Sequence, residues 1–297
     1  MDQILSMSLT KGLIVMKKMI MTMMVIFLII PATVSAFSGT LKRIEETGIM
    51  RIGYRSFQPP MSSLAKNGVP EGYSIDLCNH IAKGVQNAVG REIDVQYVQV
   101  SAENRFNTLS QNEIDILCGS TTLTLSRREI VDFTLLTFVT GGSYLTMKGV
   151  KIENNFDGKR FGVVKGTTTA TALAALFEDV GVSAEIIMID STEAGLDALE
   201  NKEIDAFCAD QVVLIGLVLQ SSDPQRYSVL PGLFSYEPFA LAVRKNDSDF
   251  RLVADKVISG LYRSNEIEQI YTRWFGKFSN IKPSAFEAMV QLNSIPE

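Results

Sequence analysis

The stretch RFNTLSQNEIDILCGS at residues 105–120 has a counterpart ninety positions later, GLDALENKEIDAFCAD at residues 195–210. In both copies a leucine, the tripeptide Glu-Ile-Asp and a cysteine stand at the same positions. Each copy predicts a short helix, a polar turn and a buried strand that ends in polar residues. Because register, residue type and context agree, the two stretches indicate two related α/β lobes.

A strand and a helix precede each copy. In the first half, MRIGYR at 50–55 predicts a strand and 74–89 predicts a helix. In the second half, RFGVVK at 160–165 predicts a strand, and GTTT at 166–169 opens a helix over 170–179. Strands that alternate with helices are typical of largely parallel sheets, in which ligands bind outside the carboxyl ends of the strands.

The chain is expected to divide into a leader and two lobes. Residues 142–237 form the second lobe, and residues 37–141 together with 238–297 form the first. The chain therefore crosses twice between the lobes, and two crossings permit hinge closure around a ligand.

Residues 1–36 have the composition of a secretory signal peptide. A basic start is followed by the apolar run MIMTMMVIFLII at 19–30 and by a small-residue exit, Val-Ser-Ala, that ends at Ala36. The apolar run is shorter than the roughly 20 residues that a membrane-spanning helix needs. We expect cleavage after Ala36 and export of an acidic, soluble chain.

The composition disfavours several function classes. The chain has 28 Lys plus Arg against 33 Asp plus Glu and a net charge of −5, so it lacks the basic surface that nucleic-acid binding requires. Its one histidine, His80, would have to supply any Ser-His-Asp, Cys-His or multi-histidine metal site alone. We therefore expect no nucleic-acid partner, no metal and no other cofactor.

The three cysteines, Cys78, Cys118 and Cys208, all lie in predicted helices or strands of apolar character. We interpret them as small buried hydrophobic residues. Export also permits disulfides, so a bridge between Cys78 and Cys118 remains open.

The segment CGSTTLTLSR, which ends at Arg127, combines hydroxyl groups with a guanidinium. Ser120 and Thr122 alternate at a strand end, so their hydroxyls point to the same side. Thr124 is expected to cap a helix over 125–133, which places Arg127 in the first turn beside free backbone N–H groups. A guanidinium with such donors suits a carboxylate. The alternative is a solvent-exposed arginine.

The second half adds donors and a carboxylate. Gly166, followed by Thr167 and Thr168, presents backbone N–H groups at a helix start, where anions bind. Asp210 ends a predicted buried strand, and its carboxylate is suited to a ligand ammonium group. Capping of the following helix is the structural alternative for Asp210. A guanidinium, helix-start donors and a carboxylate together match the zwitterion of an amino acid.

In the order and spacing of its motifs, the chain resembles the amino-acid-binding proteins of bacterial ABC importers (solute-binding protein family 3). The motifs are GYR…PP, GYSIDL, EIDILCGSTTLTLSRR, DFT, KGTTT and ALAVRK, within residues 38–276. The resemblance implies an α/β, two-lobed periplasmic-binding-protein-like fold of type II, with an open, mostly parallel sheet flanked by helices in each lobe. It also implies a monomeric receptor that binds one amino acid between the lobes and delivers it to a membrane permease.

The resemblance assigns the ligand α-carboxylate to residues from both halves. Arg127 matches the arginine that binds this group in the family. Thr122, with Thr167 or Thr168, would add hydrogen-bond donors to it.

The resemblance also assigns the other ligand groups. Asp210 would bind the α-ammonium group, helped by Ser120 and by the hydroxyl of Thr122. The branch that the chain resembles most binds glutamate and aspartate, and Arg55 and Arg105 stand where that branch has arginines near the ligand. A second ligand carboxylate would satisfy a second guanidinium.

Three alternatives remain open. An enzyme similar to the periplasmic cyclohexadienyl (arogenate/prephenate) dehydratases would need a general acid in the cleft, for which Glu71 and Glu193 are the candidates. A sensory module that contacts a membrane receptor would share the ligand chemistry. The glutamate branch tends to have a histidine near Thr192, and this chain has none there, so another polar amino acid is an alternative ligand.

Overall fold

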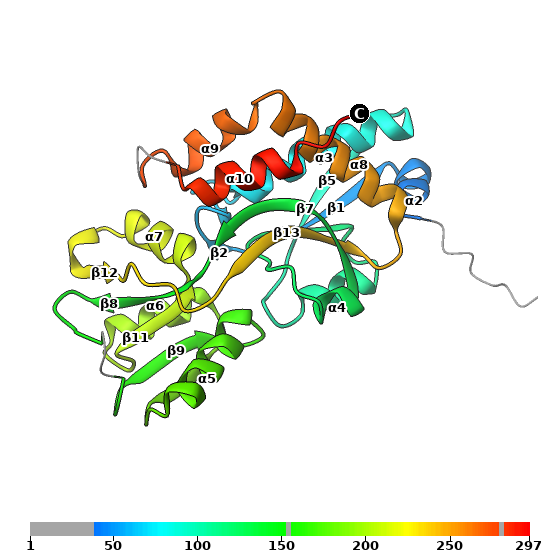
Figure 1. Ribbon diagram of the computed structural model, residues 1–297. Helices are drawn as coiled ribbons and strands as arrows, with labels where there is room; N and C mark the ends of the chain where they lie inside the picture. Colours follow the sequence, from blue (N-terminus) through cyan, green and yellow to red (C-terminus); the bar gives the residue numbers. More distant parts are fainter. Residues whose placement is uncertain (1–38, 153–155, 279–281) are drawn as a thin grey trace, which may run out of the picture. The chain divides into compact units, whose positions relative to one another are not determined.

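The computed structural model of the chain describes residues 39–152, 156–278 and 282–297. The predicted signal peptide at 1–36 lies outside these residues. Among the described helices, none combines the length and the apolar character needed to cross a membrane. The described residues form two five-stranded sheets and one small three-stranded sheet (Figure 1).

The first sheet has the strand order β5-β1-β6-β13-β7. Its strands are β1 (Ile49–Tyr54), β5 (Asp94–Gln99), β6 (Ile116–Cys118), β7 (Val131–Thr140) and β13 (Glu237–Arg244). Strand β1 pairs in parallel with β5 and β6, whereas β13 pairs antiparallel with β6 and β7. The first lobe therefore contains a strand, β13, that the chain reaches only after it has completed the second lobe.

The second sheet has the order β10-β9-β11-β8-β12. Its strands are β8 (Gly142–Met147), β9 (Arg160–Val164), β10 (Glu185–Ile189), β11 (Ala206–Asp210) and β12 (Tyr227–Val229). Strand β9 pairs in parallel with β10 and β11, and β8 pairs antiparallel with β11 and β12. Each sheet is mixed, with a parallel core of three strands, and the expected two-lobed α/β architecture is confirmed.

Helices flank both sheets, and short elements connect the strands. The helices are α2 (Thr40–Thr47), α3 (Tyr73–Val89), α4 (Arg105–Ser110), α5 (Thr168–Val180), α6 (Thr192–Glu200), α7 (Gln211–Gln220), α8 (Ser248–Arg263), α9 (Ile267–Phe275) and α10 (Ser284–Asn293). The short elements are the strands β2 (Phe57–Gln58), β3 (Ser62–Leu64) and β4 (Pro70–Glu71) and the 3₁₀ turns η1 (Arg127–Glu129) and η2 (Pro224–Arg226). Helices α8 and α10 contact β7.

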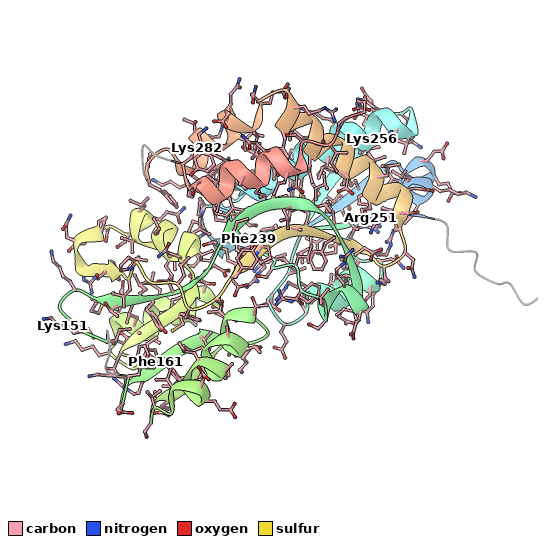
Figure 2. The ribbon with its side chains drawn as sticks, in the orientation of Figure 1. Lys151, Phe161, Phe239, Arg251, Lys256 and Lys282 are labelled. Atoms are coloured by element: carbon pink, nitrogen blue, oxygen red, sulfur yellow. A yellow bond between two sulfur atoms is a disulfide. The ribbon has the colours of Figure 1, made fainter. Side chains whose placement is uncertain are left out.

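Apolar side chains recur at helical spacing and build a core in each lobe. On α3 the buried positions Leu77, Ile81 and Val85 share one face of the helix, as a period of 3.6 residues requires. Phe239 in the first lobe and Phe161 in the second are both fully buried (Figure 2). The two cores hold the strand ends of each lobe in fixed positions.

The cysteines differ from one another. Cys78 of α3 and Cys118 of β6 form a disulfide, which was the alternative that the sequence left open. Our interpretation of these two as unpaired buried residues is therefore wrong. Cys208 in β11 is a free, buried thiol, as expected.

The helix expected over 125–133 is not formed. The structure has only the turn η1 there, and the chain enters β7 at Val131. The run VDFTLLTFVT is rich in β-branched and aromatic residues and pairs with β13, and this pairing prevails over the local helical pattern. The hydroxyl of Thr124 nevertheless accepts a hydrogen bond from the N–H of Arg127 at 3.1 Å.

The two crossings between the sheets lie side by side. Thr140, the last residue of β7, pairs with Glu237, the first residue of β13. A Cβ atom on Gly141 would clash with the carbonyl oxygen of Ser235, so only glycine permits this close approach of the two crossing segments.

Candidate functional site

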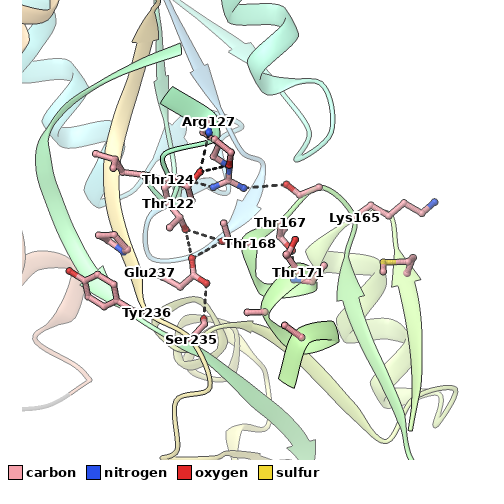
Figure 3. Close-up of a pocket in the computed structure, with 18 residues that line it drawn as sticks. Thr122, Thr124, Arg127, Lys165, Thr167, Thr168, Thr171, Ser235, Tyr236 and Glu237 are labelled. Carbon is pink, nitrogen blue, oxygen red and sulfur yellow. Dashed lines mark hydrogen bonds between the residues drawn. The ribbon is translucent and has the colours of Figure 1, made fainter. Parts of the chain in front are cut away.

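A small cavity of about 20 Å³ is lined by residues from both lobes. Its lining comprises Gln58 and all eight residues that the sequence predicted, namely Arg55, Arg105, Ser120, Thr122, Arg127, Thr167, Thr168 and Asp210. A cavity of this size has room for about one water molecule, so an amino acid enters only when side chains or lobes move apart. A wider cavity of about 930 Å³ shares Thr122, Arg127, Thr167 and Thr168 with it (Figure 3).

The first lobe contributes strand ends and short turns to the cavity. Arg55 follows β1, and Ser120 and Thr122 follow β6. Because β1 and β6 are parallel neighbours, their carboxyl ends meet at one edge of the sheet. Arg105 opens α4 and Arg127 opens η1.

The second lobe contributes a helix start and a strand end. Thr167 caps α5: its hydroxyl accepts from the N–H of Ala170 at 3.2 Å and donates to the carbonyl oxygen of Val164 at 2.7 Å. Its hydroxyl proton is therefore engaged within its own lobe. Thr168 opens α5, and Asp210 ends β11 directly before α7.

Two arginines of the first lobe reach the second. The Nη2 atoms of Arg105 and Arg127 both donate to the carbonyl oxygen of Gly166, at 3.0 and 3.4 Å. Arg127 also donates through Nη1 to the carbonyl oxygen of Thr122 at 2.8 Å, and Arg105 to that of Ala102. Both guanidinium groups thus donate to neutral carbonyl groups, and the buried Nε atom of Arg105 has no hydrogen-bond partner among the described residues.

Phe106, which sequence reasoning missed, lies against the same two arginines. The guanidinium carbons of Arg105 and Arg127 lie 4.5 and 5.3 Å from its ring centroid. Contacts of this kind attract a cation to the face of an aromatic ring. An aromatic residue directly after Arg105 was the only signal in the sequence.

Burial acts on every charged group of the cavity. It lowers the pKa values of Arg55, Arg105 and Arg127, and for Arg105 the positive charges of the other two arginines lower the pKa further. The guanidinium groups therefore lack sufficient negative charge around them. An anionic ligand would supply it.

The pKa of the carboxyl group of Asp210 is shifted in the opposite direction, upwards. Burial, followed by the negative charge of Glu237, raises its pKa to about 8, although three arginines act in the other direction. Its Oδ1 atom is buried and has no hydrogen-bond partner among the described residues. An unpartnered acceptor at this position suits a ligand ammonium group.

Two further polar residues of the site had no signal in the sequence. The Oε1 atom of Gln58, in the two-residue strand β2, accepts from the hydroxyl of Ser120 at 2.8 Å. Glu237, at the start of β13, is 1% exposed. Its Oε2 atom accepts from the hydroxyls of Thr122 at 2.5 Å and Thr168 at 2.6 Å.

The candidate acids of the enzyme alternative lie elsewhere. Glu193 lines a neighbouring cavity of about 290 Å³, which shares Arg55 with the central cavity, and Glu71 lies in β4. Neither lines the central cavity. Among the described residues, no group of three or more His, Cys, Asp or Glu side chains is arranged to hold a metal ion.

Known proteins share this architecture. The family described as bacterial extracellular solute-binding proteins, family 3, matches residues 50–277. An L-glutamate/L-aspartate-binding protein of Pseudomonas aeruginosa is 32% identical over 249 residues, which is 82% of each chain. A glutamate/aspartate import solute-binding protein of Salmonella typhimurium is 29% identical over 243 residues, 81% of this chain and 80% of that one. The crystal structure of a cysteine-binding protein of Campylobacter jejuni is 25% identical, with a TM-score of 0.71, and the match covers 84% of this chain and 98% of the other.

Proposed function

This chain belongs to the bacterial extracellular solute-binding proteins of family 3, and we propose that it binds glutamate or aspartate between its two lobes. It is a periplasmic binding protein and not an enzyme, and it delivers an amino acid to the permease of an ABC importer. The choice of an acidic amino acid rests on the site.

The charge balance of the cavity carries the proposal. Three guanidinium groups, of Arg55, Arg105 and Arg127, line it. Two carboxylates oppose them, those of Asp210 and Glu237, so that one positive charge is left over when both are ionised. Glutamate and aspartate each carry one net negative charge at neutral pH. A neutral amino acid would leave an uncompensated buried charge, which costs several kcal/mol.

The hydrogen bonds of the arginines support the same ligand. Arg105 and Arg127 both donate to the neutral carbonyl oxygen of Gly166. A carboxylate carries the opposite charge to a guanidinium and can accept two parallel hydrogen bonds from it, so a ligand carboxylate would replace this carbonyl as the acceptor. Asp210, whose Oδ1 atom lacks a partner, would then bind the ammonium group.

We extend the proposal to the organisation of the chain. Residues 142–237 would form the second lobe, and residues 37–141 with 238–297 the first. Cleavage after Ala36 would release the mature, monomeric protein. The change of sheet between β7 and β8, and again between β12 and β13, supports these lobe boundaries.

A thermal-shift panel of the mature protein with the common amino acids, arogenate and prephenate tests the ligand. A ligand at 100 times its Kd adds about 2.7 kcal/mol of stability. At ~2–4 °C per kcal/mol, we expect glutamate or aspartate to raise the Tm by about 5–11 °C. A response only to neutral amino acids would overturn the acidic ligand. A response only to arogenate or prephenate, with turnover, would overturn the receptor function.

A further inference from the structure

The carboxylate of Glu237 lies at the contact between the two lobes. It receives a hydrogen bond from Thr122 of the first lobe and another from Thr168 of the second, both on Oε2. Its Oε1 atom accepts from the hydroxyl of Ser235 at 2.7 Å. The carboxylate is 1% exposed, so three hydroxyl groups take the place of water as its hydrogen-bond donors (Figure 3).

The direction of these hydrogen bonds follows from the chemistry of the partners. An ionised carboxylate only accepts, whereas a hydroxyl has one proton to donate and two lone pairs to accept with. Thr122 and Thr168 therefore both point their protons at Glu237. Hydrogen bonds to an anion are the stronger kind, so a ligand has to compete with Glu237 for these protons.

Both threonines also line the central cavity. With their protons turned to Glu237, they present lone pairs to whatever occupies the cavity. Lone pairs match an ammonium group, which has only donors. Asp210 lines the same cavity and adds a third acceptor.

We propose that Glu237 is a positioning residue that orients the hydroxyls of Thr122 and Thr168 as acceptors for the ligand ammonium group. This inference rests on the proposed binding of an amino acid. It keeps the expected role of the Thr122 hydroxyl at the ammonium group. It changes one expectation from the sequence, since the Thr168 hydroxyl no longer serves as a donor to the α-carboxylate. That group is left to the guanidinium groups and the backbone N–H groups.

The arrangement also couples recognition to closure. The hydroxyls of Thr122 and Thr168 lie 3.1 Å apart, although they belong to different lobes. Glu237 receives both protons only when the lobes are this close. The complete set of acceptors therefore exists only in the closed arrangement.

A pair of ligands that differ only in the amino group provides the test. L-Glutamate has the ammonium group and glutarate lacks it, and the affinity of each is measured by calorimetry, with competition against L-glutamate for the weaker ligand. In Glu237→Gln the amide nitrogen can donate to a threonine oxygen and reverse a hydroxyl. We expect this variant to bind L-glutamate at least tenfold more weakly and glutarate within about threefold of the wild type.

The variants Thr122→Val and Thr168→Val provide a second test, in which Glu237 itself is unchanged. Each variant should lose affinity for L-glutamate and keep its affinity for glutarate. The matched control is Glu200→Gln, which changes a carboxylate that is bonded to Tyr227 and does not line the cavity. The control should leave both affinities unchanged.

The outcomes are distinct. Equal losses for both ligands would show that the threonine hydroxyls donate to a carboxylate, and would overturn the inference. Unchanged affinity for both ligands in Glu237→Gln would overturn it as well. A wild-type protein that binds no acidic amino acid contradicts the proposed function instead, and the same comparison is then made with the amino acid that does bind and its counterpart without the amino group.

Discussion

The two copies of the Glu-Ile-Asp pattern directly precede strands β6 and β11, and the aspartate has the same backbone role in each. The Oδ2 atom of Asp115 accepts from the N–H of Arg51 at 2.7 Å, at the start of the parallel pair β1 and β6. The Oδ2 atom of Asp205 accepts from the N–H of Arg160 at 2.8 Å, at the start of β9 and β11. The pattern thus fixes a strand to its parallel neighbour in both lobes.

The surroundings of the two aspartates differ. The side chain of Asp115 is fully buried and lies 2.5 Å from Arg43 and 3.7 Å from Arg244. The side chain of Asp205 is 27% exposed and, within the part of the chain that the structure describes, pairs with Arg160 alone, at 3.2 Å. A repeated sequence pattern therefore reproduces a backbone contact, whereas the packing around it decides how much that contact contributes to stability.

Substitution of Asp115 and Asp205 should reveal the largest difference in stability between the two copies of the pattern. Asp115→Asn keeps an acceptor for the backbone but leaves Arg43 and Arg244 short of a buried counter-charge, so we expect a loss of about 3–5 kcal/mol in the free energy of unfolding. Asp205→Asn should cost far less, because solvent screens its ion pair. Urea unfolding of the ligand-free protein measures both, and equal losses would contradict the comparison.

The strand ends of the two lobes differ in charge, because Arg127 follows β6 and Asp210 ends β11. Substitution of the positively charged residue should therefore weaken the binding of a ligand carboxylate. Arg127→Ala removes a guanidinium that faces Asp210 across the cavity, and we expect ligand affinity to fall by ~2–5 kcal/mol because a ligand carboxylate is left unpaired. Arg128→Ala changes the adjacent, exposed arginine and is the matched control. Calorimetry with glutamate measures both variants. Near-normal affinity in Arg127→Ala would remove this residue from the binding site.

The cysteines of the two strands give a third contrast. The disulfide between Cys78 and Cys118 closes a sequence separation of 40 residues, so replacing both by alanine should cost about 2–4 kcal/mol. Cys208→Ala in the second lobe should cost about 1 kcal/mol, since it removes only a small buried group. Thermal unfolding compares the two variants. A larger loss from Cys208→Ala would contradict the prediction.

The last effect concerns the proton on Asp210, whose pKa burial raises from 3.8 to about 8. A ligand ammonium favours the ionised carboxylate, so below pH 8 binding must release a proton and affinity should fall by up to about tenfold per pH unit. Above pH 8 this dependence should vanish. The folded ligand-free protein binds more protons than the unfolded chain between pH 3.8 and 8, so its stability should decrease as the pH rises through that range.

Calorimetry across this pH range, with Asp210→Asn as the reference, measures the proton linkage. The variant should bind more weakly and without this pH dependence. A wild-type affinity that is independent of pH from 6 to 8 would contradict the assignment of Asp210 to the ammonium group.

The sequence predicts those parts of the cavity that local pattern controls. Arg55 and Ser120 follow predicted strands of the first lobe, so parallel-sheet geometry brings them to one edge of the first sheet. Asp210 ends a predicted strand of the second lobe and Thr168 opens the helix after the neighbouring strand, so the same geometry brings these two to one edge of the second sheet. The eight predicted residues line one cavity, while their individual roles stay predictions.

Contacts set by distant pairing could not be predicted. Glu237 meets Thr122 across 115 positions of sequence, because β13 returns to pair with β7 in one particular register. No local spacing encodes that register. The failed helix at 125–133 has the same origin, since a helical pattern yielded to a strand partner more than a hundred residues away.

The pairing of Thr140 with Glu237 also constrains how the lobes move. Two separate linkers would allow the lobes to twist, slide and swing independently. Paired strands keep a spacing of about 4.8 Å, so the two crossings act together as one flat ribbon. Such a ribbon bends out of its plane far more easily than within it. The lobes therefore open by a hinge rotation about a single axis. Capture and release of the amino acid therefore follow the same path in opposite directions.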